Sequence, residues 1–213
     1  MKKIELQLAM DGAATRTLDQ AMEIIDRVAP YLDIIEIGTS FVLRYGMEPV
    51  SRVKAAHPDK KILADMKVMD GGYHNCGLGC KAGGDIVTVL GVSDHGTIQN
   101  ATKAAHDYGN QIMVDLICVK DVAETIAFCE EIGTDYICVH TGVDMQAQGK
   151  DPLDALKEAL ALVKNCKVSV AGGINEDTIE GICRLGPDAV IVGGGIYKKE
   201  NGNLLFHGAV PME

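Results

Sequence analysis

Seven ionisable side chains stand at or just after the ends of short apolar runs in this chain. They are Asp11, Glu36, Asp65, Lys67, Asp70, Asp115 and His140. A single carboxylate in such a place is usually a helix cap or a structural ion-pair partner. Several carboxylates at one rim are costly to bury unless a divalent cation or a lysine compensates their charge. The set therefore predicts a polar site that holds a metal ion, a lysine or both.

The chemistry open to these groups depends on their spacing. Glu36 and Asp65 end consecutive apolar runs, so we expect their oxygens to share one hard cation, Mg²⁺ or Mn²⁺. Lys67 follows Asp65 by two residues, where its ammonium would meet a developing enediolate oxygen or transfer a proton. Its structural alternative is an ion pair with Asp65 or Asp70. His140 is an acid–base candidate because imidazole ordinarily titrates near neutral pH.

Glycines follow the last two apolar runs instead of carboxylates. The first loop has Gly172 and Gly173, and the second has Gly193, Gly194 and Gly195. Glycines allow backbone N–H groups to approach an anion closely. Either loop alone is also compatible with a tight turn that binds nothing. The two together predict a phosphate site.

Eight aliphatic and β-branched runs must carry these groups, and amphipathic stretches separate them. The expected strands are residues 4–10, 34–37, 61–66, 86–90, 111–116, 136–140, 167–171 and 189–192. The expected helices are residues 17–31, 97–108, 123–132, 152–163 and 176–185. Strand ends recur roughly every 25 residues, about the length of a repeated βα unit. The strands are nearly all apolar, as parallel strands buried on both faces are.

The repeat predicts a single domain over residues 1–213, a (β/α)8 TIM-type barrel, with a doubly wound open sheet as the alternative. In such barrels the chemistry lies at the carboxyl ends of the strands, and the loops after strands 7 and 8 usually bind phosphate. Two places depart from the repeat. Residues 75–82 include two glycines, which weaken a helix by ~1 kcal/mol each. Residues 197–213 have no helical pattern, so we expect an atypical C-terminal segment in place of the last helix.

Composition excludes several classes of partner. The formal net charge is −10 and only 4% of residues are aromatic, so nucleic acid is not expected to bind. Because no run approaches the ~18 apolar residues of a membrane span, we expect no membrane association. The seven cysteines are odd in number and form no C-x-x-C pair, which predicts reduced thiols and a cytoplasmic location. His74, Cys76 and Cys80 lack the second ligand pair of a zinc finger.

The residues from Asp65 to Gly72 read Asp-Met-Lys-Val-Met-Asp-Gly-Gly. This stretch matches the D-x-K-x-x-D signature of the orotidine monophosphate decarboxylase superfamily. With residues 6–11, 36–39, 87–92, 139–147 and 171–174, it resembles the 3-hexulose-6-phosphate synthase family. The resemblance extends over residues 4–196, and the motifs are specific as a set.

The resemblance implies a lyase, a metal-dependent aldolase that reversibly condenses ribulose 5-phosphate with formaldehyde through an enediolate. The implied roles are metal binding for Glu36 and Asp65, proton and charge handling for Lys67, acid–base catalysis for His140, orientation of substrate hydroxyls for Asp11, and phosphate binding for Gly172, Gly173, Gly193 and Gly194. Asp115 is a further candidate substrate contact. The resemblance also implies a homodimer with shared active sites, in which Asp70 acts in the site of the neighbouring subunit.

Two other functions stay open from the sequence. The related 3-keto-L-gulonate 6-phosphate decarboxylase forms the same kind of enediolate by losing CO₂. Relative to that enzyme, Asp115 replaces a glutamate, and Val143 and Gly194 each replace an arginine. All three positions favour the synthase. The missing last helix and the glycine-rich third helix leave a sugar-phosphate-binding paralogue without turnover as the second alternative.

Overall fold

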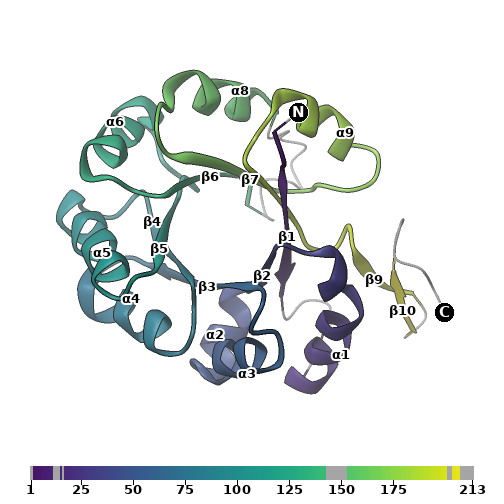
Figure 1. The fold of residues 1–213 in the computed structure, drawn as a ribbon. Coiled ribbons are helices and arrows are strands. Elements are labelled where there is room, and N and C mark those ends of the chain that lie inside the picture. The colour runs from purple at the N-terminus through teal and green to yellow at the C-terminus, as the bar shows by residue number, and fades with distance from the viewer. Residues whose placement is uncertain (1, 12–14, 16, 143–152, 201–202, 207–213) are drawn as a thin grey trace.

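Eight parallel strands close into a barrel in the computed structural model, which describes residues 2–11, 15, 17–142, 153–200 and 203–206. Strands pair in chain order, and the last strand returns to pair with the first, so the sheet is closed. Figure 1 looks along this barrel and shows the ring of strands inside a ring of helices. The predicted (β/α)8 barrel is confirmed, and the open sheet is wrong.

The strands lie close to where apolar patterning predicts them. They are β1 (Glu5–Met10), β2 (Ile34–Ile37), β3 (Lys61–Val68), β4 (Ile86–Leu90), β5 (Gln111–Asp115), β6 (Tyr136–His140), β7 (Lys167–Ala171) and β8 (Ala189–Val192). The largest difference is β3, which continues two residues beyond its expected end. Its pairing with β4 shifts register between Ala64 and Val68, because a bulge accommodates the extra residues.

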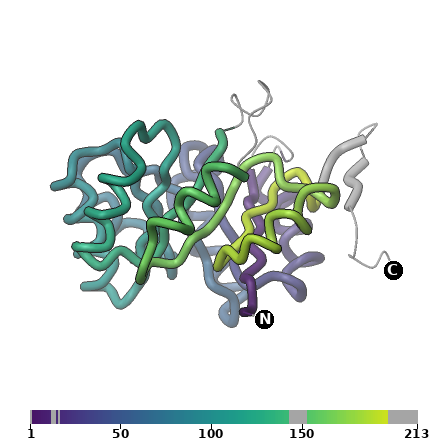
Figure 2. The backbone as a smooth tube through the Cα atoms, turned by 90° about the horizontal axis from the view of Figure 1, so that it is seen from above, coloured from purple at the N-terminus to yellow at the C-terminus, as the bar shows by residue number. Residues whose placement is uncertain are grey.

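Helices cover the outside of the barrel, as Figure 2 shows from a second direction. They are α1 (Leu18–Val28), α2 (Thr39–Tyr45), α3 (Glu48–Ala56), α4 (Gly72–Lys81), α5 (His95–Asp107), α6 (Val122–Ile132), α8 (Leu153–Leu162) and α9 (Ile179–Leu185), with the 3₁₀ turn η1 (Ala29–Tyr31) after α1. The helices α2 and α3 were not among those expected from the sequence. No helix of the described residues is both long and apolar enough to cross a membrane.

The glycine-rich stretch forms the full helix α4, because its glycines allow close packing. A Cβ on Gly79 would lie 2.8 Å from the Met66 sulfur and 3.0 Å from a Val87 methyl group. At Gly72, the first residue of α4, a Cβ would lie 2.2 Å from the carbonyl oxygen of Thr97. The low helix propensity is therefore offset by the packing of α4 on the barrel and on α5.

The segment after β8 is not helical where it is described. Its backbone forms an antiparallel pair, β9 (Tyr197–Glu200) with β10 (Asn203–Phe206). This agrees with the expected absence of a final helix pattern. Residues 207–213 lie outside the described residues.

Two apolar layers hold the barrel together. The larger layer lies between the strands and the helices and includes Leu8, Ile35, Ile62 and Val114, all fully buried. The smaller layer fills the barrel interior. It consists of Ile34, Leu63, Ile86, Met113, Tyr136, Cys138, Ala171 and Ile191. Side chains that alternate along each strand thus face the two layers in turn.

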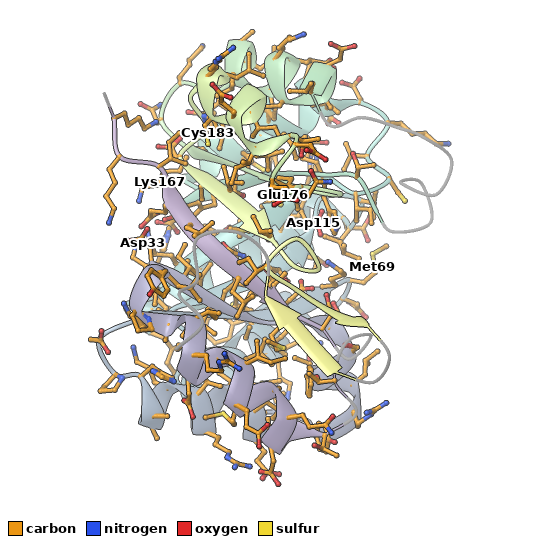
Figure 3. The ribbon with its side chains drawn as sticks, turned by 90° about the vertical axis from the view of Figure 1, so that its right-hand side faces the viewer. Asp33, Met69, Asp115, Lys167, Glu176 and Cys183 are labelled. Atoms are coloured by element: carbon orange, nitrogen blue, oxygen red, sulfur yellow. The ribbon has the colours of Figure 1, made fainter. Side chains whose placement is uncertain are left out.

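A repeated contact fixes the amino ends of the strands. An aspartate directly precedes each even-numbered strand, and its carboxylate accepts the backbone N–H of the second residue of the preceding strand. The pairs are Asp33 with Leu6, Asp85 with Ile62, Asp135 with Ile112, and Asp188 with Val168, at 2.7–3.0 Å. Figure 3 shows Asp33 and Lys167 at this end, and Met69 and Glu176 towards the other. The ionisable groups of interest therefore lie at the end opposite to this ring of contacts.

Candidate active site

A cavity of about 900 Å³ lies at the carboxyl ends of the strands. Its lining includes Asp11, Glu36, Asp65, Lys67, Asp115, His140, Gly172, Gly173, Gly193 and Gly194. The structure thus brings together every predicted site residue except Asp70. This convergence follows from the barrel, because parallel strands deliver all their carboxyl ends to one face.

Asp65 is held by three donors at the floor of this cavity. Thr39 donates to Asp65 Oδ2 at 2.6 Å, and Thr88 donates to Oδ1 at 2.8 Å. The Lys67 ammonium lies 3.2 Å from Oδ1. Because the Asp65 side chain is also buried, its orientation is fixed before any ligand binds.

Glu36 is a buried carboxylate that forms no ion pair among the described contacts. Gln7 donates to Glu36 Oε2 at 2.6 Å. Burial raises the pKa of the Glu36 carboxyl well above its ordinary value, and repulsion from Asp65 and Asp11 adds to this effect. A divalent cation between the carboxylates would remove that repulsion and favour the ionised form.

The residues present fit Mg²⁺ in this position. Glu36 and Asp65 come from the neighbouring strands β2 and β3, and their oxygens are ligands that hard cations prefer. Mg²⁺ is commonly bound by one or two carboxylates, with water and substrate oxygens as the remaining ligands. The described residues contain no group of three or more His, Cys, Asp or Glu side chains arranged to hold a metal on their own. A cation held by Glu36 and Asp65 would need oxygens from solvent or substrate to complete its coordination.

Asp115 connects the two groups that could move protons. Its Oδ2 accepts from the Lys67 ammonium at 2.9 Å and lies 2.8 Å from His140 Nδ1, while its Oδ1 accepts the Ile117 backbone N–H at 2.9 Å. Both Asp115 oxygens thus have partners in the protein. We infer that Asp115 orients Lys67 and His140, a role that sequence spacing did not indicate.

The pKa values of Asp115 and Lys67 are shifted by the charged side chains around them. Burial alone would raise the pKa of Asp115, but His140 and Lys67 outweigh burial and lower it. Burial alone would lower the pKa of Lys67, but Asp65 and Asp115 outweigh burial and raise it. Lys67 therefore stays a cation at neutral pH and is suited to stabilise negative charge on a substrate oxygen.

Asp11 directly follows β1 and lines the same cavity. Ser40 donates to Asp11 Oδ1 at 3.0 Å. Burial raises the pKa of Asp11, Ser40 opposes this, and the charge of Asp65 raises it further. Gly38 makes room for this carboxylate, because a Cβ there would lie 2.2 Å from Asp11 Oδ1. Asp11 is thus placed to accept hydrogen bonds from hydroxyl groups in the cavity.

The glycine loops lie side by side at the cavity wall formed by β7 and β8. Gly172 and Gly173 have φ of +120° and +66°, which L side chains rarely adopt. A Cβ on Gly172 would lie 2.6 Å from the carbonyl oxygen of Thr141, and one on Gly195 would lie 2.3 Å from that of Ile174. Only glycine permits this close approach of the loops.

Asp70 does not line the cavity. It is exposed, and its Oδ1 accepts the backbone N–H of Gly71 at 2.7 Å. Its neighbours Met69 and Tyr73 are also unusually exposed for large apolar side chains, at 53% and 43%. Asp70 therefore lies outside the cavity of its own chain, beside exposed apolar side chains.

Sequence reasoning missed several residues that hold the site. Gln7 lies within β1, Thr39 begins α2, and Thr88 is the middle residue of β4. For Gln7 and Thr88 the available signal was a polar residue within an otherwise apolar run, which is unfavourable inside a barrel unless the residue has a polar partner. Val143 lies outside the described residues.

The chain belongs to the orotidine 5'-phosphate decarboxylase / HUMPS family, whose model matches residues 5–203. It is 43% identical over 193 residues to a curated 3-hexulose-6-phosphate synthase of Bacillus subtilis, with 91% of this chain and 90% of that protein covered. A solved 3-hexulose-6-phosphate synthase from Salmonella typhimurium has a TM-score of 0.87 and 44% identity, with 91% and 90% of the chains covered.

A solved relative with another activity is less similar. It is described as KGPDC, the decarboxylase introduced above, from Streptococcus mutans in complex with ribose 5-phosphate. It has a TM-score of 0.79 and 27% identity, and 91% of this chain and 89% of that chain are covered. The lower identity favours the synthase for this chain.

Proposed function

We propose that this protein is an enzyme with 3-hexulose-6-phosphate synthase activity. The observation that carries the proposal is the placement of Lys67 between Asp65 and Asp115, with His140 on the same Asp115 oxygen. This arrangement puts a fixed cation beside an acid–base group in the cavity at the carboxyl ends of the strands. Such a pair suits a reaction that removes a carbon-bound proton and stabilises the resulting enediolate.

The proposed reaction neither consumes nor releases a proton overall. His140 takes the proton from C1 of ribulose 5-phosphate, and the bonding electrons move to the carbonyl to give an enediolate. Lys67 stabilises the negative oxygen. C1 then forms a bond to the carbon of formaldehyde, and the formaldehyde oxygen takes a proton from His140. The product is 3-hexulose 6-phosphate, and the same steps in reverse release formaldehyde.

Glu36 and Asp65 would hold the divalent cation in this proposal. When bound, the cation would supply Lewis-acid stabilisation of the substrate oxygens as negative charge develops. Asp11 would orient substrate hydroxyl groups, and Asp115 would keep Lys67 and His140 in place.

The glycine loops of β7 and β8 would bind the phosphate of the substrate. Loops at these positions commonly bind phosphate in barrels. Binding the phosphate would supply energy for orienting the reacting carbon, which formaldehyde is too small to provide.

A turnover assay tests the proposal. We expect the purified chain to consume formaldehyde and ribulose 5-phosphate in equal amounts in the presence of Mg²⁺, with 3-hexulose 6-phosphate detected by NMR. Release of CO₂ from 3-keto-L-gulonate 6-phosphate, without formaldehyde consumption, would assign the chain to the decarboxylase instead. Binding of ribulose 5-phosphate with no turnover of either substrate would support the non-catalytic alternative.

Two positions should distinguish the synthase from the decarboxylase. Gly194 is exposed at the cavity wall, and Val143 follows β6 outside the described residues. We expect Val143→Arg combined with Gly194→Arg to shift catalysis towards decarboxylation of 3-keto-L-gulonate 6-phosphate, because the added cations suit its carboxylate and phosphate groups. The measurement is the ratio of kcat/KM for the two substrates. Loss of synthase activity with no gain of decarboxylation would show that these positions do not set the choice.

We further propose that two chains form a homodimer in which each cavity is completed by the Asp70 of the other chain. The exposed position of Asp70 and the apolar side chains beside it support this arrangement. Its test is described in the Discussion.

A further inference from the structure

The bulge of β3 is a strained piece of backbone within the cavity floor. Ala64 pairs with Val87, and Val68 pairs with Val89, so three residues of β3 lie opposite the single residue Thr88 of β4. Within the bulge, Lys67 has φ of +43°. Non-glycine residues adopt this conformation rarely, and it persists only where the surroundings hold it.

The Thr88 hydroxyl holds the bulge at two points. Its oxygen accepts the backbone N–H of Lys67 at 2.9 Å, and its proton is donated to Asp65 Oδ1 at 2.8 Å. A threonine hydroxyl has one proton to donate and lone pairs that accept, so these two bonds use it in both directions. Thr88 is only 3% exposed, so water has little access to replace it.

Through these contacts, Thr88 supports two residues of the proposed reaction, Lys67 and Asp65. The Lys67 ammonium lies 3.2 Å from Asp65 Oδ1, the oxygen that Thr88 also contacts. If the hydroxyl were absent, the Lys67 N–H would lose its partner and Asp65 would lose one of its donors. The bulge could then relax towards regular pairing with β4, which would turn the Lys67 side chain away from Asp115.

We propose that Thr88 is a positioning residue that sets the geometry of Lys67 relative to Asp65 by fixing the β3 bulge. Thr88 also lines the cavity, but its hydroxyl is engaged by Lys67 and Asp65, and it acts through these two residues. The inference rests on the proposed function, because its kinetic test measures synthase turnover. The backbone conformation of Lys67 gives a second test that does not depend on activity.

The test compares Thr88→Val, which has a similar shape without the hydroxyl, with Thr88→Ser, which keeps it. Displacing a catalytic group by about 1 Å costs on the order of 10²-fold in rate. We therefore expect Thr88→Val to lower kcat by about that factor while KM for ribulose 5-phosphate changes by less than about threefold. Thr88→Ser should keep kcat within about threefold of wild type. Thr88→Ala serves as a second variant without the hydroxyl if Thr88→Val does not fold.

Thr102→Val is the matched control. Thr102 is also 3% exposed, and its hydroxyl donates to the carbonyl oxygen of Ile98 at 2.9 Å within α5. It does not line the cavity. We expect this variant to lower Tm without lowering kcat, because it removes a buried hydroxyl far from the proposed chemistry.

Two kinetic results would overturn the proposal. One is a Thr88→Val enzyme with wild-type kcat, and the other is equal impairment of Thr88→Val and Thr88→Ser. A crystal structure of Thr88→Val gives the independent readout, since we expect φ of Lys67 to become negative. An unchanged bulge in that structure would also contradict the role of the hydroxyl. If the wild-type protein consumes no formaldehyde, the proposed function fails. The positioning role of Thr88 is still tested in that case by φ of Lys67 in the crystal structure of Thr88→Val.

Discussion

Treatment with EDTA is expected to abolish turnover, and added Mg²⁺ is expected to restore it. Glu36→Gln should raise the Mg²⁺ concentration needed for half-maximal activity sharply and lower kcat/KM on the order of 10³-fold, because a metal ligand is lost. The buried Glu36 lies close enough to Asp65 and Asp11 for their charges to raise its pKa, so the three carboxylates form a site of concentrated negative charge. A glutamine keeps the shape and one oxygen but removes the charge that attracts the cation.

Metal binding can be measured without turnover. Calorimetric titration with Mg²⁺, or electron paramagnetic resonance with Mn²⁺, should show weaker binding to Glu36→Gln than to wild type. Glu176→Gln is the control, since Glu176 is an exposed carboxylate of the same cavity on the loop after β7 (Figure 3). It should keep the metal requirement of wild type. Full activity in chelator, or an equal effect of the two substitutions, would remove Glu36 from the metal site.

The barrel could be predicted from the sequence because two features of the sequence indicate its strands. Each is a short apolar run, and all but β3 and β5 are directly followed by a polar or glycine residue where the chain leaves the core. β2, β4, β6, β7 and β8 have the bounds expected from this pattern. Closure of the sheet also followed from the number of repeats, since eight βα units complete a barrel.

The details of the site could not be predicted in the same way, because they depend on contacts between strands. Sequence spacing places Asp65 and Lys67 near each other, but it does not reveal the bulge that lets β3 continue to Val68. The role of Asp115 as a common partner of Lys67 and His140 depends on three strands meeting at one rim. Glycines in α4 indicated a weak helix, whereas their packing against neighbouring elements is visible only in three dimensions.

Lys67→Ala and Asp70→Ala are each expected to be nearly inactive, yet mixing them should restore activity if the sites are shared. Asp70 does not line the cavity that contains Lys67, although it follows Lys67 by only three positions in the sequence. Exposed Met69, Tyr73 and Leu78 lie on the same loop and helix α4, a surface on which a second chain would bury apolar area. Contact across that surface would bring Asp70 of each chain to the cavity of the other.

Subunit mixing gives this prediction a quantitative form. After joint unfolding and refolding in equal amounts, random pairing gives mixed dimers in which one site has both wild-type residues, so activity should approach about a quarter of wild type. If each residue serves its own chain, all mixed dimers stay inactive. As a second arm, wild type mixed with the Lys67→Ala/Asp70→Ala double variant should retain about a quarter of the activity for shared sites and about half for separate sites. Recovery near zero in the first arm and about half in the second, with mixed dimers verified by native mass spectrometry, would show that Asp70 acts within its own chain.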